Sequence, residues 1–359
     1  MTQRARLADT SEDFKKYDIN KNTVATWEDG IRTNPNTKGT YEWWYFDANL
    51  NDGSQLVITF FAKSAVNPGS ELEPSIDIEL TQADGSKVSD HLEFTPAEFS
   101  AAKDECNVKI GQNYFRGNLK HYQIGVFSPK ITVELEFDNV TPAWRRNVCI
   151  FFGDHDENNF GWLPATPRGK VTAKVTIASK EQTLTGDCYH DHNWGDVALM
   201  KVMHHWYWGR ANIGDYTVIS SYMTAEKKYG YQKLPIFFLA KKDQVLADNP
   251  KYMTYSEQDK QIDEQTKKPF HNQIIYDYND GKHHYKISYL REKTISRISF
   301  IDQISGIKKL LAKLAGFDGA YLRFSGKIKL EVFDGDQIIE TQSSQGLWEE
   351  MYFGKTLDV

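Results

Sequence analysis

Histidine is concentrated in one stretch of the chain, residues 185–210, which reads TGDCYHDHNWGDVALMKVMHHWYWGR. Four of the ten histidines fall there, and Asp191 stands between His190 and His192. A second stretch, Tyr41–Ala48 (YEWWYFDA), places an acidic residue beside two tryptophans. A carboxyl group beside large apolar rings loses hydration, so its pKa rises and it can stay protonated near neutral pH. Both stretches therefore indicate acid–base chemistry.

A protonated carboxylic acid in an apolar cavity could protonate an unactivated C=C bond, and aromatic faces could hold the resulting carbocation by cation–π attraction. A histidine could take a proton from the incoming water or from a neighbouring carbon. The candidate catalytic residues are Asp191, His192, Glu42 and His190. The candidate substrate-binding residues are Trp43, Trp44, Tyr45, Trp194, His205, Trp206, Trp208 and Tyr222. The alternative is structural, since ion-pair networks that only satisfy backbone ends or arginines also shift pKa values.

A metal site is a further alternative for the histidines. His190 and His192 are two residues apart, so they share one face if they lie on a strand. With His204 or His205 they could form a three-histidine zinc site. The spacing is not that of an HExxH motif and no cysteine adds a ligand, so we expect no metal and no other cofactor. Motifs for nucleotide phosphates and for a GxSxG serine nucleophile are also absent from the sequence.

Composition narrows the class of protein. The chain has 359 residues, a net charge of −6 and a pI near 6.0, which argues against a nucleic-acid partner because such a partner needs a basic face. The three cysteines, Cys106, Cys149 and Cys188, are widely spaced, as expected in a reducing compartment. The first residues lack an apolar signal segment, and nowhere do 18 apolar residues run together, so we expect a cytoplasmic protein.

Aromatic and β-branched runs separated by short turns predict a mostly β protein. The clearest signal is a hairpin of residues 41–50 and 55–62 around Asp52-Gly53. Further strands are predicted over residues 75–80, 87–94, 113–122, 123–127, 130–137 and 170–177, with a loop over residues 153–169 and an exposed polar excursion over residues 249–271. Ile301–Leu314 has the spacing of an amphipathic helix with lysines on it. Such a helix usually packs on its own domain, but it could also contact a membrane surface.

An internal repeat divides the chain in two. WWYFDANL (Trp43–Leu50) resembles WYWGRANI (Trp206–Ile213), and GKVTAKV (Gly169–Val175) resembles GKIKLEV (Gly326–Val332). The repeats predict two similar β-domains, antiparallel barrels or sandwiches, each of which begins with the aromatic strand. The predicted parts are an N-terminal arm at residues 1–37, a first domain at 38–196 and a second domain at 197–359.

The blocks GTYEWWYFDA, GDCYHDHNWG and HHWYWGR resemble the signature blocks of the carotenoid 1,2-hydratase (hydroxyneurosporene synthase) family, whose relatives include kievitone hydratase. The resemblance implies two tandem lipocalin-like domains and a cofactor-independent enzyme that acts on a hydrophobic, often isoprenoid, substrate. The family's His-x-Trp is carried by His192 and Trp194, and its acidic neighbour by Asp191. The closing strand of the second half, Trp348-Glu349-Glu350, has no histidines, which argues against a second active site.

Three functions stay open. The first is a hydro-lyase with a pocket between the two domains, in which Asp191 donates the proton and His192 orients the acid or the water. The second is a pericyclic cyclase of the Diels-Alderase kind, which needs only a pocket that holds one conformer of a polyene. The third is a non-catalytic carrier of a lipophilic ligand. Each of the three functions requires a hydrophobic small molecule as partner. The sequence does not predict the oligomeric state.

Overall fold

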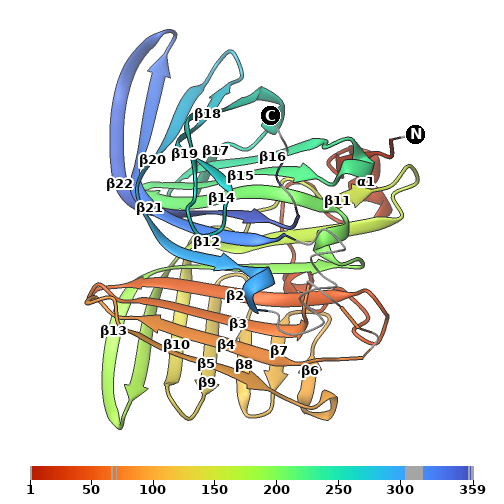
Figure 1. Ribbon diagram of the computed structural model, residues 1–359, viewed down its shortest axis with the longest axis vertical. Coiled ribbons are helices and arrows are strands. Elements are labelled where there is room, and N and C mark those ends of the chain that lie inside the picture. The colour runs from red at the N-terminus through yellow and green to blue at the C-terminus, as the bar shows by residue number, and fades with distance from the viewer. Residues whose placement is uncertain (1, 66–67, 70, 304–317, 355, 357–359) are drawn as a thin grey trace. The chain divides into compact units, whose positions relative to one another are not determined.

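The structure is a computed structural model that describes residues 2–65, 68–69, 71–303, 318–354 and 356. Nearly all of the regular structure in these residues is antiparallel β-sheet, as Figure 1 shows. The chain divides into two compact units, each with its own sheet and apolar core. The N-terminal unit is Arg6–Leu199, and the C-terminal unit combines Met200–Val359 with Met1–Ala5. The predicted mostly β fold is therefore confirmed.

The N-terminal unit holds a 13-stranded sheet. Its strands are β1 Ala5–Leu7, β2 Tyr41–Leu50, β3 Gln55–Lys63, β4 Ser75–Thr81, β5 Lys87–Glu93, β6 Phe99–Ala101, β7 Cys106–Ile110, β8 Asn113–Gly117, β9 His121–Phe127, β10 Thr132–Thr141, β11 Ile150–Phe152, β12 Asn158–Ile177 and β13 Lys180–Gly195. The order is β5-β4-β3-β2-β13-β12-β10-β9-β8-β7-β6, and β11 joins β1 to β12. The chain thus forms a meander whose last strand, β13, returns to pair with β2.

One face of this curled sheet forms the core of the N-terminal unit. Figure 1 shows β2–β5 crossing over β7–β10. Phe46 and Ile58 from the first group of strands and Phe115 and Phe137 from the second belong to one buried cluster. The hairpin of β2 and β3 turns at Gly53, whose φ of 87° lies in the left-handed region that glycine tolerates. This hairpin confirms the strongest strand signal of the sequence.

The residues before β2 are more than an arm and a lead-in loop. They form the helix α1 (Ser11–Lys16) and the 3-10 turn η1 (Thr26–Asp29). The last two residues of η1, Glu28 and Asp29, are buried although both are acidic. Arg145 donates to the Glu28 carboxylate at 2.5 Å, and the indole of Trp44 donates to the Asp29 carbonyl at 3.1 Å. These contacts hold η1 against the sheet. A segment of polar sequence therefore places the Asp29 carboxyl group in the core.

The predicted loop over residues 153–169 is mostly strand, because β12 begins at Asn158. The stretch contains Pro164 and Pro167, which have no backbone N–H to give to a ladder. The register of β12 against β13 shifts twice around these prolines. The prolines therefore sit at irregularities of the ladder, where a missing donor is tolerated.

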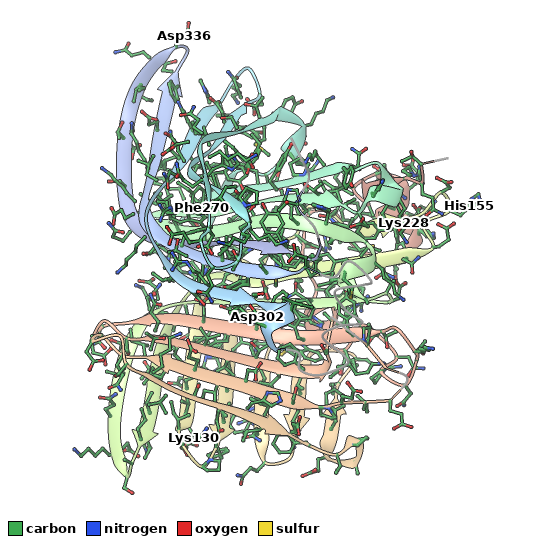
Figure 2. The ribbon with its side chains drawn as sticks, viewed as in Figure 1. Lys130, His155, Lys228, Phe270, Asp302 and Asp336 are labelled. Atoms are coloured by element: carbon green, nitrogen blue, oxygen red, sulfur yellow. The ribbon has the colours of Figure 1, made fainter. Side chains whose placement is uncertain are left out.

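The C-terminal unit has the same strand connections in a nine-stranded sheet. Its strand order is β17-β16-β15-β14-β22-β21-β20-β19-β18. Its strands are β14 Met203–Ile213, β15 Tyr216–Ala225, β16 Lys233–Lys241, β17 Gln244–Ala247, β18 Met253–Ile262, β19 Pro269–Asn279, β20 His284–Ser299, β21 Ala320–Asp334 and β22 Gln337–Tyr352. Its last strand, β22, pairs with its first, β14, as β13 pairs with β2. Figure 2 shows Phe270 among the interior side chains of this unit and Asp336 at the tip of the β21–β22 hairpin.

Two other predictions fall in the C-terminal unit. The polar excursion at residues 249–271 contains β18 and the start of β19; it is exposed because β18 is the edge strand of the sheet. The amphipathic helix predicted over Ile301–Leu314 lies outside the described residues, apart from the 3-10 turn Phe300–Gln303. Within the part of the chain that the structure describes, no helix is both long and apolar enough to cross a membrane.

Candidate active site

Successive side chains of β13 point to opposite faces of the sheet, and this alternation separates the predicted catalytic residues. His190 and His192 face the core, opposite Phe46 and Trp44 of β2. Asp191 points to the other side of the sheet, which we term the outer face. His192 therefore cannot orient the Asp191 carboxyl directly, and this part of the sequence hypothesis does not agree with the geometry.

His190 lies fully buried among aromatic rings of the core. Its ring centroid is 4.5 Å from that of Phe115 and 4.9 Å from that of Tyr122. Its Nδ1 donates to the carbonyl oxygen of Tyr45 at 2.8 Å. Its Nε2 lies 3.2 Å from Oδ2 of Asp29, which also accepts from the Tyr122 hydroxyl at 2.6 Å. His190 is thus held by the backbone of β2 on one side and by a buried carboxyl group on the other.

His192 is bound to a second buried acid, Glu42. Its Nε2 donates to Glu42 Oε1 at 2.7 Å, and its ring stacks on Trp44 with centroids 4.6 Å apart. Glu42 also accepts from the backbone N–H groups of Arg32, at 2.6 Å, and Thr33, at 2.9 Å. Each carboxyl oxygen of Glu42 therefore receives a backbone hydrogen bond, which fixes the orientation of the group.

Asp29 connects the two histidines, and we term Asp29, Glu42, His190 and His192 the core-face network. His190 Nε2 faces Asp29 Oδ2, because its Nδ1 donates to the Tyr45 carbonyl. His192 Nδ1 lies 3.5 Å from Asp29 Oδ1, and both atoms are buried without a hydrogen-bond partner. The Asp29 carboxyl group therefore lies between the two imidazole rings.

The three-histidine zinc site was an alternative in which His204 or His205 would join His190 and His192. His204 and His205 belong to the C-terminal unit, where their Nδ1 atoms lie 2.7 Å apart. Among the described residues, Asp29, Cys106 and His190 offer one ligand atom each, all within 4.8 Å of one another and all buried. Burial, and next to it the Asp29 carboxylate, raises the pKa of the Cys106 thiol well above its ordinary value. A metal would have to displace that proton.

Asp191 lies at the centre of a separate group on the outer face. Its Oδ2 accepts from the Tyr189 hydroxyl and from the Trp162 indole N–H, both at 2.8 Å. Its Oδ1 accepts from the side-chain amide of Asn193 at 2.7 Å. Tyr45 stands directly opposite on β2. We term these five residues the outer-face cluster.

The environment of Asp191 suits an acid that changes its protonation state. Burial raises the pKa of Asp191 above its ordinary value, and the hydrogen bonds from Tyr189 and Trp162 offset only part of this rise. Because Oδ2 already accepts two hydrogen bonds, a proton on the carboxyl group would sit on Oδ1. Trp43 and Tyr45 beside it are partly exposed, whereas His190, His192 and Glu42 are enclosed. Two members of the outer-face cluster, Tyr45 and Trp162, are thus partly exposed, whereas every member of the core-face network is buried.

The predicted binding residues of the N-terminal unit divide between the two faces. Trp44 and Trp194 lie on the core face, where both rings contact His192. Trp43 and Tyr45 alternate with Trp44 along β2 and lie on the outer face. These four residues therefore do not line one common surface of this sheet.

The same division holds in the C-terminal unit. His205 and Tyr222 face its core, where they stack on Tyr352 and Tyr255 respectively. Burial, followed by the charges of His204 and Lys233, lowers the pKa of His205 to about 3, so its ring is neutral at neutral pH. Trp206 and Trp208 occupy the alternate positions on the outer face. The Trp206 indole N–H donates to Glu349 Oε1 at 3.1 Å.

Sequence reasoning missed several side chains that complete these groups. Asp29 belongs to the core-face network and Tyr122 donates to it, while Trp162 and Tyr189 belong to the outer-face cluster. One signal could have drawn attention to the segment that carries Asp29. The rule that singled out Glu42, an acid beside tryptophan, applies equally to Glu28 in Trp27-Glu28-Asp29. The other three residues are ordinary aromatic strand residues, and only the fold brings them to a carboxyl group.

The chain is similar to proteins named as hydratases and as enzymes of rearrangement chemistry. Residues 155–313 match a family model described as Diels-Alderase-like. The chain is 26% identical over 213 residues to hydroxyneurosporene dehydrogenase of Chlorobaculum tepidum, a match that covers 48% of this chain and 53% of that protein. It is 24% identical over 222 residues to the acyclic carotenoid 1,2-hydratase of Rubrivivax gelatinosus, covering 57% and 53%. It is 25% identical over 200 residues to the quinolone epoxide rearrangement protein asqO of Emericella nidulans, covering 50% and 53%.

These matches confirm the resemblance that the sequence blocks suggested, and they span about half the length of each relative. Solved structures are similar over nearly the whole chain. CghA with Sch210972 is 12% identical with a TM-score of 0.60, covering 99% of this chain and 100% of that chain. Kievitone hydratase from Nectria haematococca is 11% identical with a TM-score of 0.53, covering 98% and 97%. At such identities the likeness establishes the fold, which agrees with the expected pair of lipocalin-like β-domains.

Proposed function

We propose that the chain is a cofactor-independent hydro-lyase that adds water to a C=C bond of a hydrophobic substrate, with Asp191 as the proton donor. The observation that carries the proposal is the Asp191 carboxyl group itself. It is buried, its pKa is raised, and it lies beside Trp162, Tyr189 and the partly exposed Tyr45. The names of two similar proteins, a carotenoid 1,2-hydratase and a kievitone hydratase, support hydration as the reaction.

In the proposed reaction, Asp191 Oδ1 transfers its proton to one carbon of the C=C bond, and the other carbon becomes a carbocation. The ring faces of Trp43 and Tyr45 attract the cation. Water then bonds to the cationic carbon, and its surplus proton returns to Asp191, which restores the acid. Between these steps the carboxylate is stabilised by the donors on Tyr189 and Asn193 and by the Trp162 indole.

The core-face network has a positioning role in this proposal. His190 and His192 share β13 with Asp191, and each is bound to β2 or to the residues before it. Glu42 extends this connection to the backbone at Arg32. The network therefore restrains the two strands that carry the outer-face cluster. An acid that must approach one carbon of a substrate depends on such restraint, since small errors in position lower the rate steeply.

A cyclase is the second candidate, and one observation favours it. Three donors converge on Asp191, an arrangement that also stabilises a permanently ionised carboxylate. In a cyclase the cluster would bind a polar group of a polyene while the aromatic rings hold one conformer, without proton transfer. The Diels-Alderase-like family model, CghA and the epoxide rearrangement protein support this alternative by name. A carrier without catalysis is the remaining alternative.

The test is incubation in H2¹⁸O with acyclic isoprenoids that end in an isopropylidene group: lycopene, squalene and geranylgeraniol. The native protein is expected to give a product with one ¹⁸O atom per hydrated bond. Asp191→Asn should lower the rate by at least about 100-fold, the usual range for loss of a general acid, while substrate binding survives. Asp187→Asn is the matched control, because Asp187 lies on the same strand but pairs with Arg168 and Lys170 near the surface.

The outcomes separate the candidates. Full activity of Asp191→Asn would remove Asp191 from the role of acid. A product with the mass of the substrate, formed at similar rates by both variants, would favour the cyclase. Tight binding of an isoprenoid without any product would favour the carrier.

A further inference from the structure

The closing strand of the C-terminal unit carries a buried acid, Glu350, at the position that His192 holds in the N-terminal unit. Glu350 stands opposite Tyr207 in the β14–β22 ladder, as His192 stands opposite Trp44 in the β2–β13 ladder. The sequence repeat aligns Tyr207 with Trp44, so the two positions are equivalent. Glu350 is only 1% exposed. A carboxylate loses its hydration in such a place, so the position calls for a partner.

The surroundings keep Glu350 neutral. Burial raises the pKa of Glu350 well above its ordinary value, and hydrogen bonds with Tyr352 and Tyr207 offset the rise only in part. The Tyr352 hydroxyl already donates to the carbonyl of Pro269 at 3.0 Å. Burial, the largest cause of the shift, thus favours the protonated form of Glu350.

One oxygen of this acid is unused. Glu350 Oε2 is buried and has no hydrogen-bond partner. If Oε1 carries the proton, Oε2 is the carbonyl oxygen and a bare acceptor. Most buried polar atoms have a partner, and leaving one unsatisfied is unfavourable. The group that would satisfy Oε2 is a hydrogen-bond donor.

The acid is connected to the edge of the unit. The Tyr207 hydroxyl lies 3.1 Å from Nδ1 of His271, and this Nδ1 lies 3.5 Å from Oε2 of Glu257. Burial lowers the pKa of His271, so its ring is neutral and can accept from the tyrosine. The Glu257 side chain is 31% exposed. Tyr207, His271 and Glu257 thus form a row of polar groups that leads from the core toward the surface.

Tyrosine rings surround this end of the core. Tyr222 stacks on Tyr255 with centroids 3.8 Å apart, and both are only half-buried. Tyr255 contacts Tyr276 edge-on at 5.2 Å. In the N-terminal unit the corresponding space around the buried histidines is filled by phenylalanines such as Phe115 and Phe137. Tyrosines combine a large apolar face with a polar edge, a combination that suits an amphiphilic small molecule.

We propose that the core face around Glu350 is a second ligand site, which takes a hydrophobic molecule that carries a hydroxyl group. The ligand hydroxyl donates to Glu350 Oε2, and the apolar body of the ligand lies against Tyr222 and Tyr255. This site uses none of the residues of the outer-face cluster. It also gives the C-terminal unit a binding role although its closing strand lacks the histidines of the N-terminal unit.

The test compares farnesol with farnesene, which has the same carbon skeleton without the hydroxyl group, by calorimetric titration. The native protein is expected to bind farnesol about tenfold more tightly, the usual effect of satisfying one buried polar atom. Glu350→Met removes the acceptor and should abolish this preference while farnesene binding stays. Exchange of a buried acid for an apolar residue is usually tolerated, and circular dichroism checks the fold. Glu340→Gln, on the same strand, is the control that should keep the preference.

Infrared spectroscopy tests the same site without relying on affinity. The carbonyl band of a protonated carboxyl group should be present at neutral pH in Asp191→Asn, which lacks the other buried acid of raised pKa, and absent when Glu350→Met is added to that variant. Farnesol, but not farnesene, should shift that band to lower frequency in Asp191→Asn, whose outer-face cluster is impaired. Equal affinities for the two probes, a preference that survives in Glu350→Met, or an unshifted band would each overturn the proposal, the last because water alone then satisfies Oε2.

Discussion

The two units have the same strand connections but opposite core chemistry. In each of them a meander is closed by pairing of the last strand with the first. In the N-terminal unit this pairing buries the core-face network, four side chains that can carry charge among phenylalanines. In the C-terminal unit it buries one acid, Glu350, which burial keeps neutral among tyrosines. The shared topology therefore does not dictate what the core holds, because alternate residues of the closing strand can change while the ladder stays.

The outer faces of the two units are more alike than their cores. Asp191 stands opposite Tyr45, and Glu349 stands opposite Trp208 at the equivalent position of the repeat. Each of these acids accepts from an indole N–H and from a tyrosine hydroxyl. The donors are Trp162 and Tyr189 for Asp191, and Trp206 and Tyr321 for Glu349. An arrangement that both halves of one chain keep on their outer faces supports the placement of the proposed chemistry there.

The largest expected difference between the units concerns stability. Glu42→Ala removes one member of a buried charged network, so we expect the free energy of unfolding to fall by about 3–5 kcal/mol. Glu350→Met replaces a neutral buried acid by an apolar side chain and should change stability by less than about 1.5 kcal/mol. Urea unfolding followed by circular dichroism measures both. If both substitutions changed the free energy of unfolding by the same amount, the core around Glu42 would not depend on its acid more than the core around Glu350 does.

The sequence was sufficient to predict the mostly β fold. Aromatic and β-branched runs on either side of the Asp-Gly turn predicted β2 and β3. The internal repeat predicted that β2 and β14 are the equivalent first strands of the two units. The prediction was wrong where proline and glycine suggested a loop, because β12 accommodates Pro164 and Pro167 at shifts in its register. The composition of residues 153–169 cannot show that β13 tolerates these register shifts in its pairing with β12.

The candidate site residues were chosen by type, and the sequence did not show which side chains would contact them. Asp191 and His192 are adjacent in sequence, which made a joint role attractive, yet adjacency on a strand puts side chains on opposite faces. Asp29 was missed because its segment looks like a polar lead-in, and only the contacts of Trp44 and Tyr122 show why that segment enters the core. A periodicity argument applied within the stretch itself would have separated Asp191 from His190 and His192.

The second expected effect is a pH dependence that only the C-terminal acid produces. The pKa of Glu350 is higher in the folded state than its ordinary value of 4.5, so the folded protein keeps a proton that the unfolded chain loses. The stabilisation from this proton is complete below pH 4.5 and is lost as the pH rises toward the folded pKa. The free energy of unfolding of the native protein, relative to Glu350→Gln, should therefore fall by up to about 2 to 3 kcal/mol between pH 5 and 7. If the difference in the free energy of unfolding between the native protein and Glu350→Gln did not change between pH 5 and 7, Glu350 would not carry a proton in the folded state.

The smallest expected effect tests the likeness of the outer faces. Trp162→Phe and Trp206→Phe each remove one indole N–H from an acid, and each should lower the free energy of unfolding by about 1 kcal/mol. They should differ in activity. The Trp162 hydrogen bond lowers the pKa of Asp191, so its loss should raise that pKa further and extend hydration of the isoprenoid probe to higher pH. Trp206→Phe alters only the equivalent acid, Glu349, and should leave the pH profile where it was. If instead Trp206→Phe shifts the profile and Trp162→Phe does not, the proton comes from the outer face of the C-terminal unit, and Glu349 takes the place of Asp191.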